Sequence, residues 1–157
     1  MRSSSSPRPE TALDAAGLLF SFRVLLFAAI AAPLLLRLVK LTRLRDWLEP
    51  SSPPPRLADA ADAAGIEALV RRLDALLAAG RPLVRSGCLT RGLTLYRFLR
   101  LAGADVSLHF GMGKMNGELT GHCWLVFGGE PLAEPRDPRP LYVETWRIAP
   151  DGPAKLA

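Results

Sequence analysis

A loop turns into a helix within one stretch of the sequence, Arg85-Ser86-Gly87-Cys88-Leu89-Thr90-Arg91-Gly92-Leu93, and Cys88 stands at the turning point. Downstream, Gly121-His122-Cys123-Trp124-Leu125-Val126 is typical of a strand. The free N–H groups and the positive dipole of a helix N-terminus favour a thiolate at Cys88. A histidine brought against it can take or share its proton. The two segments predict a thiolate nucleophile paired with His122 as its base.

The helix that starts at Cys88 is predicted to be central and heavily buried. Ser86 is a candidate N-cap, and Gly103 ends the helix after Leu101. Apolar side chains cover most of its circumference, which is typical of a buried helix. A preceding helix is predicted over 59–79, where Ile66, Leu69, Val70, Leu73, Leu76 and Leu77 form an apolar stripe.

After Ala104 the periodicity changes from helical to alternating. Strands are predicted over 106–110, 122–127 and 141–148, with a glycine-rich connection over 111–118 and a tight turn at Gly128-Gly129. Helices followed by an antiparallel sheet indicate an α+β fold rather than a doubly wound one. We expect N-terminal helices to pack on a small antiparallel sheet.

The chain divides into four predicted regions: a disordered tail (1–16), an apolar and amphipathic helical region (17–49), a proline-rich linker (50–58) and a core (59–157). Residues 17–38 fit a buried or interfacial helix, a membrane-inserted helix or a signal peptide. Arg23 and Pro33 argue against a simple span. The amphipathic segment 37–48 suits a membrane surface or the edge of the core.

Composition excludes several classes of protein. The chain has 157 residues, 22% charged and 49% hydrophobic, which indicates a single globular domain. Its net charge of +5 suits an anionic surface or an acidic peptide, but there is no nucleic-acid-binding motif. Two cysteines are too few for a disulfide scaffold. Nothing matches paired zinc-ligand spacing, so no metal or other cofactor is expected.

The rest of the site is predicted from strand geometry. Alternation puts His122 and Trp124 on one face of their strand, and Cys123 on the other. A helix packed on the His122 face would bring Cys88 to the imidazole and exclude Cys123. The acid that orients the imidazole is left open between Glu134, Asp137 and Glu144.

Two segments carry a family resemblance: Cys88-Leu89-Thr90-Arg91-Gly92-Leu93-Thr94-Leu95 and His122-Cys123-Trp124-Leu125. Together they resemble the stand-alone protease half of the B protein of lasso peptide biosynthesis. That leader peptidase is part of the transglutaminase-like, papain-like cysteine peptidase superfamily. The segment from Leu41 to Leu48 is similar to the opening helix of that family.

The resemblance implies roles for three residues: Cys88 as nucleophile, His122 as general base and Glu134 as the acid. Cys123 and Glu134 depart from the usual alanine and aspartate, and Asp137 is the fallback acid. We also expect Trp124 and Arg91 to contact substrate. The implied reaction is leader removal through a thioester.

The resemblance also implies partners: a lasso precursor peptide, a separate leader-recognition protein and an asparagine-synthetase-like macrolactam cyclase. No nucleic acid is expected, and the expected location is cytoplasmic. Independently of the resemblance, the apolar and amphipathic residues 17–48 leave association with a membrane surface open. The alternatives are a transglutaminase-like amidase or acyltransferase of other specificity, and a non-catalytic scaffold that binds precursor or recruits partners to a membrane.

Overall fold

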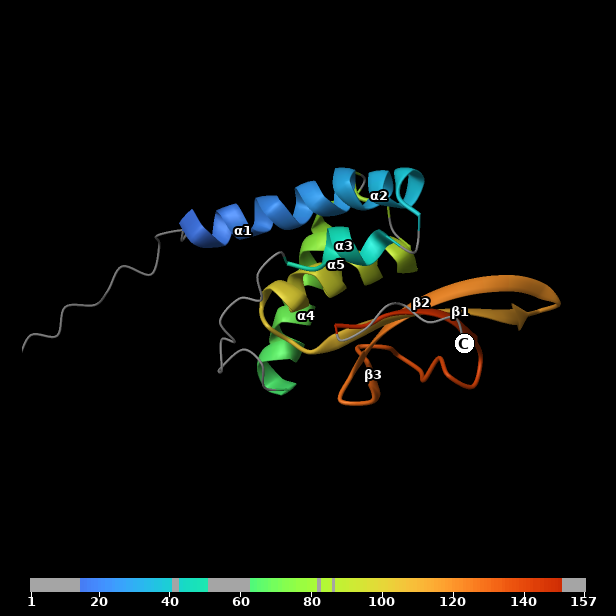
Figure 1. Cartoon of the computed structure of the whole chain (residues 1–157). Coiled ribbons are helices and arrows are strands. Elements are labelled where there is room, and N and C mark those ends of the chain that lie inside the picture. Colours follow the sequence, from blue (N-terminus) through green and yellow to red (C-terminus); the bar gives the residue numbers. More distant parts are fainter. Residues whose placement is uncertain (1–14, 41–42, 51–62, 82, 86, 151–157) are drawn as a thin grey trace, which may run out of the picture.

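The computed structural model shows an α+β architecture in which helices lie on one side of a four-stranded antiparallel sheet (Figure 1). It describes residues 15–40, 43–50, 63–81, 83–85 and 87–150. The helices are α1 (Ala15–Leu26), the π-helical turn η1 (Phe27–Ala31), α2 (Ala32–Leu38), α3 (Leu44–Leu48), α4 (Ala63–Ala79) and α5 (Cys88–Leu101). The strands are β1 (Val106–Met115), β2 (Glu118–Phe127), β3 (Glu130–Leu132) and β4 (Val143–Ile148), in the order β3-β2-β1-β4. The predicted fold class is confirmed.

Helix α5 is the central element of the core, as its all-round apolar sequence predicts. Leu93 and Leu99 are fully buried on α5, and Leu108 on β1 and Leu125 on β2 are buried in the same cluster. Burying a leucine side chain of this kind contributes roughly 1.5–3 kcal/mol. Helix α5 ends at Leu101, and Gly103 follows it with a φ of 84°. This packing fixes the position of Cys88 relative to the sheet.

The glycine-rich segment predicted as a loop is strand instead. Strand β1 runs through it to Met115, and the hairpin turns at Asn116-Gly117, both with positive φ. The glycines allow neighbouring backbone to come close to β1: a Cβ on Gly113 would lie 2.3 Å from the Leu141 carbonyl oxygen. Such crowding excludes any side chain there. The short strand β3, absent from the sequence prediction, follows the Gly128-Gly129 turn.

The N-terminal helical run lies along α5 on the side away from the sheet (Figure 1). Val24, Ala28 and Ala32 are fully buried on its inner face. By length and composition, Ala16–Leu38, with a mean hydropathy of 2.2, is also able to cross a membrane, a property shared by core helices and signal sequences. The π-helical turn η1 ends at Ala31, two residues before Pro33, which cannot donate a backbone hydrogen bond to the preceding turn.

The amphipathic segment 37–48 is not one helix, contrary to its periodicity. Helix α2 ends at Leu38, Val39 is extended with φ −107° and ψ 129°, and α3 begins at Leu44. The break lets α3 fold back so that Leu44 and Leu48 are buried. The predicted tail up to residue 14 and most of the predicted linker lie outside the described residues.

Candidate active site

Cys88 is the first residue of α5, as predicted. Gly87 takes the N-cap position with an extended backbone, and its carbonyl oxygen accepts the N–H of Arg91 at 3.1 Å. The predicted cap, Ser86, lies outside the described residues. Gly87 has no side chain to cap the helix, and the first turn carries no acidic residue. The positive end of α5 therefore acts on the Cys88 sulfur.

His122 connects Cys88 to a carboxylate. The imidazole is near enough to the Cys88 side chain to lower the pKa of its thiol, and its Nε2 lies 3.0 Å from Oε2 of Glu134. Because Nε2 is engaged with Glu134, Nδ1 is the nitrogen left for the thiol. The structure thus brings together the three side chains that the sequence singled out. Their order, thiol to imidazole to carboxylate, is that of a nucleophile, a base and an orienting acid.

The two rival acids have other partners. Asp137 is exposed and pairs with Arg139 at 2.8 Å. Glu144 lies 2.7 Å from Nδ1 of His109, which is on β1. Of the three carboxylates left open by the sequence, Glu134 is the one placed against His122.

Arg91, one turn into α5, holds Glu134 in place. Its guanidinium lies 3.3 Å from Oε1 of Glu134 and donates to the Ala133 carbonyl oxygen at 3.2 Å. It also forms a two-pronged pair with Asp74 of α4 at 2.8 and 2.9 Å. Bidentate pairs of this kind fix geometry as well as charge. The contacts described make Arg91 a positioning residue for the acid, and its predicted contact with substrate stays a prediction.

Strand β2 presents the opposite face to α5 from the one expected. A Cβ on Gly92 would lie 2.8 Å from the Cys123 sulfur, so the helix packs on the Cys123 face. The Cys123 sulfur lies 2.9 Å from the Cys88 carbonyl oxygen. Cys123 is therefore part of the site, and the inference that excluded it is wrong. Because Cys88 is the first residue of the helix, it lies near both His122 and Cys123, which point to opposite faces of β2.

The surroundings of Cys88 lower the pKa of its thiol to about 5. A hydrogen bond from the Cys123 thiol is the largest cause, and burial opposes it. The Cys123 backbone N–H and then His122 lower the pKa further. The Cys123 thiol has a single proton, so it serves either the Cys88 sulfur or the Cys88 carbonyl oxygen at one time. The pKa of Cys123 itself is raised well above its ordinary range by Cys88 and by burial.

A layer of aromatic side chains packs against the imidazole of His122. Trp124 stacks on His122 at 6.1 Å and on His109 at 5.8 Å between ring centroids, and Tyr142 lies 5.1 Å from His122. Trp124 is 2% exposed, which leaves little of its surface for a substrate. That Trp124 binds substrate stays a prediction. In the structure its ring packs against the imidazole of His122.

His109 and Tyr142 are members of this layer that sequence reasoning did not assign to the site. His109 shares a strand face with the Trp124 ring because the two residues pair across β1 and β2. Strand alternation could have placed it there once the register was known. Within the described ranges, no three His, Cys, Asp or Glu side chains are arranged to hold a metal ion.

The rate of Cys88 alkylation is expected to follow thiolate formation with a midpoint near pH 5, measured with iodoacetamide and peptide mass spectrometry. The thiol is protonated, and unreactive, as the pH falls below that value. Cys123→Ala removes the largest cause of the lowered pKa, so its midpoint should move upward. At about pH 6 the thiolate fraction then falls about ten-fold for each unit that the pKa rises above 6. An unshifted midpoint in Cys123→Ala would assign the low pKa to the helix and His122 alone.

One comparison with known proteins gives a match. A family model described as the transglutaminase-like superfamily matches residues 26–147, from the end of α1 into β4. The matched region contains Cys88, His122 and Glu134. No curated protein and no solved structure gives a significant match.

Proposed function

Because the chain belongs to the transglutaminase-like superfamily, whose members are generally catalytic, we propose that it is a cysteine peptidase that removes the leader from a ribosomally made lasso peptide precursor. The observation that carries the proposal is the position of His122, which lowers the pKa of the Cys88 thiol on one side and lies 3.0 Å from Glu134 on the other. A thiol whose pKa is lowered to about 5 is largely ionised at neutral pH. It is therefore ready to attack a carbonyl carbon.

In the proposed first step, the Cys88 sulfur attacks the carbonyl carbon that joins leader to core. The backbone N–H of Cys88, which has no intrahelical partner at the helix start, stabilises the oxyanion. His122 gives a proton to the departing amine of the core, and the C–N bond breaks to leave a leader thioester. Glu134 stabilises the charged imidazole and keeps Nε2 occupied, so that Nδ1 faces the sulfur.

In the second step, His122 takes a proton from water as the water attacks the thioester carbonyl. The C–S bond then breaks and returns the Cys88 thiolate, and the leader departs with a new carboxylate. Throughout, Arg91 holds Glu134 against the imidazole. The products are a free leader acid and a core peptide with a free N-terminal amine.

The choice of substrate is supported by the sequence resemblance at Cys88-Leu89-Thr90-Arg91 and His122-Cys123-Trp124-Leu125. In this proposal a separate leader-recognition protein presents the precursor. An asparagine-synthetase-like cyclase uses the amine that cleavage frees. These partners follow from the resemblance, and they define what has to be added to an assay.

Incubating the full chain with a lasso precursor and its leader-recognition protein should cut the leader at one bond. In water enriched in heavy oxygen, mass spectrometry is expected to find one heavy atom in the new leader carboxylate and none in the core. Transfer of the leader to an added amine without hydrolysis would favour the acyltransferase alternative. A folded chain that binds the precursor but leaves it intact with both partners present would refute the peptidase.

A further inference from the structure

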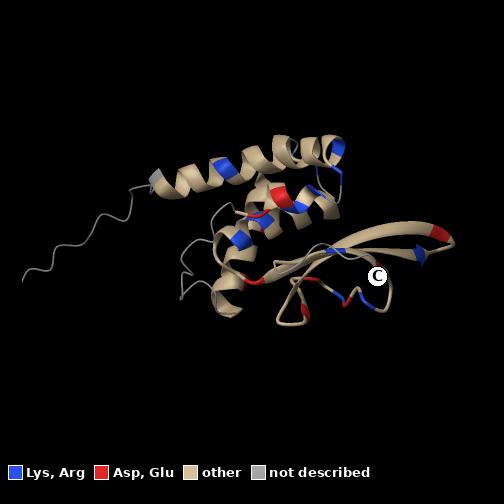
Figure 2. Ribbon diagram, viewed as in Figure 1, with Lys and Arg blue, Asp and Glu red and all other residues tan. Residues whose placement is uncertain are grey.

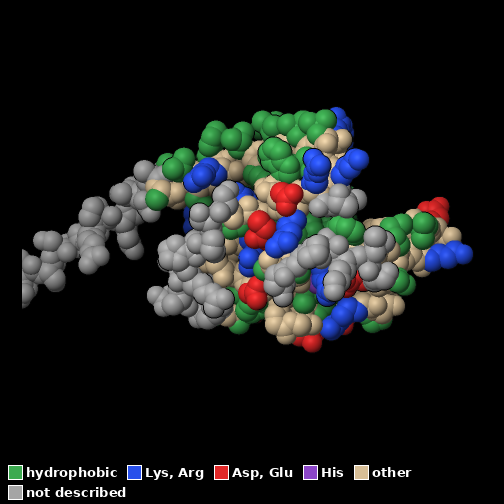
Figure 3. All heavy atoms as spheres, viewed as in Figure 1, with side chains coloured by type: hydrophobic (Ala, Val, Ile, Leu, Met, Phe, Trp, Pro, Cys, Tyr) green, Lys and Arg blue, Asp and Glu red, His purple; other side chains and the backbone are tan. Residues whose placement is uncertain are grey.

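The N-terminal helical run presents large apolar side chains to solvent along its whole length. Figure 3 shows apolar side chains gathered over α1 and α2. We call this surface the outer apolar face, and define it by Leu18, Phe22, Leu26, Ile30 and Leu34, which are between 46% and 62% exposed. Successive members are four residues apart, so each lies beside the next on the surface of the run. An exposed apolar stripe of this length is unusual for a surface in contact with water alone.

The opposite side of the same run is attached to the domain. Val24, Ala28 and Ala32 are fully buried, and the Phe20 and Phe27 rings meet Phe98 of α5 edge-on at 5.6 and 5.9 Å. Crossing a bilayer would require these contacts to break, and it would bury Arg23 in hydrocarbon. The packed helix is suited instead to lying in the plane of an interface, with its outer side in contact with lipid.

The α2 end of the outer apolar face carries side chains that complement anionic lipid headgroups. Leu38 and Trp47, 77% and 63% exposed, line a pocket of about 380 Å³ together with Lys40 and Arg43. Arg37 is exposed in the last turn of α2. Figure 2 shows cations gathered at this end. Tryptophan with its ring at the interface and cations beside it is the pattern that anionic membranes bind.

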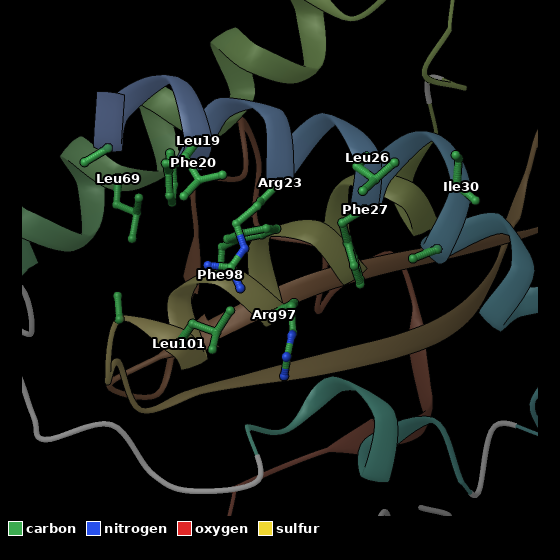
Figure 4. A pocket seen from close by; sticks show the side chains of 13 residues that line it. Leu19, Phe20, Arg23, Leu26, Phe27, Ile30, Leu69, Arg97, Phe98 and Leu101 are labelled. Carbon is green, nitrogen blue, oxygen red and sulfur yellow. The ribbon is translucent and has the colours of Figure 1, made fainter. Parts of the chain in front are cut away.

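A hollow beside the run adds room for an acyl chain. Figure 4 shows it between α1 and α5, about 840 Å³ in volume, with Leu19, Leu26 and Ile30 on one wall and Leu101 on the other. The outer apolar face and the hollow share Leu26 and Ile30. Arg23 also lines the hollow, and is exposed, so it can meet a negative headgroup.

We propose that the outer apolar face docks this protein in the plane of an anionic lipid bilayer. The layer order is compatible with catalysis on a docked molecule, because α5 lies between the N-terminal run and the sheet that carries His122 (Figure 1). The docked face and the sheet of the site thus lie on opposite sides of α5. This proposal rests on the exposed surface and does not depend on what the site cleaves.

Vesicle sedimentation of the full chain tests the docking. The protein should pellet with mixed phosphatidylcholine–phosphatidylglycerol vesicles more than with phosphatidylcholine vesicles. Phe22→Glu is expected to weaken binding about ten-fold or more, because an exposed aromatic ring no longer enters lipid. Arg37→Gln and Lys40→Gln should each weaken binding to the anionic vesicles about five-fold. Concentrated salt should release the protein, since screening weakens the headgroup contacts.

Leu119→Glu is the matched control, because Leu119 is 74% exposed on the β1–β2 hairpin, away from the outer apolar face. It should bind vesicles like the unmodified chain, and thermal unfolding should show that all variants fold. Equal loss in Leu119→Glu and Phe22→Glu would overturn the proposal, as would equal binding to neutral and anionic vesicles. If the unmodified chain forms dimers and does not bind vesicles, and Phe22→Glu dissociates those dimers, the outer apolar face would instead contact a second copy of the chain. Retention after an alkaline wash would overturn the in-plane geometry.

Discussion

Cys88→Ala is expected to lower kcat/KM for leader cleavage by about 10^4-fold or more, to the residual level that precursor binding and the oxyanion donor supply without a nucleophile. Alanine removes the sulfur that forms the thioester and leaves the start of α5 unchanged, because Gly87 and not the cysteine takes the N-cap position. Cleavage is measured by separating leader and core with the recognition protein at saturation. The variant should still bind precursor, since the loss lies in the chemical step.

Cys123→Ala is the matched control, because its sulfur lies in the same site and 2.9 Å from the Cys88 carbonyl oxygen. This second variant should keep a measurable rate at alkaline pH, where Cys88 ionises without help from its neighbour. A loss confined to Cys88→Ala identifies the nucleophile. Undiminished cleavage by folded Cys88→Ala would rule out the thioester mechanism, and an equal loss in both variants would indicate a structural effect.

The elements that could be predicted from sequence are those fixed by local chemistry. The start of α5 at Cys88 follows from the change in composition around Gly87, and its end from Gly103. Glu134 is different: local chemistry leaves three acids open, and only the spacing after His122 in the family that the chain resembles selects it. A twelve-residue separation brings the acid back to the histidine because the Gly128-Gly129 turn reverses the chain between β2 and β3.

The elements that could not be predicted depend on contacts distant in sequence. Strand alternation separates His122 from Cys123, but which of the two faces α5 covers depends on tertiary packing, including the close approach of Gly92 to the Cys123 sulfur. The glycines of β1 look like a loop because their partners, the Trp124 ring and the Leu141 carbonyl, lie elsewhere in the chain. The break at Val39 likewise depends on the burial of Leu44 and Leu48. In each case tertiary packing overrides the local pattern.

The Trp124 ring links the stability of the fold to the geometry of the site. Its side chain is buried, it stacks on both His122 and His109, and a Cβ on Gly111 would come within 2.9 Å of it. Its indole N–H has no hydrogen-bond partner among the described residues. The Trp124 ring therefore stabilises the fold through its size and its stacking. No hydrogen bond within the described residues offsets the cost of burying its N–H.

Trp124→Ala is expected to lower the free energy of unfolding by about 3–5 kcal/mol, because it leaves a large cavity under the imidazole. Trp124→Phe keeps an aromatic ring and removes the unpartnered N–H, so it should cost less than about 1.5 kcal/mol. Denaturant unfolding gives both values, and a cost below about 0.5 kcal/mol for Trp124→Ala would contradict the packing. In cleavage assays Trp124→Phe should keep kcat, since His122 retains its support. A raised KM in that variant, with stability kept, would instead show that the indole N–H binds substrate.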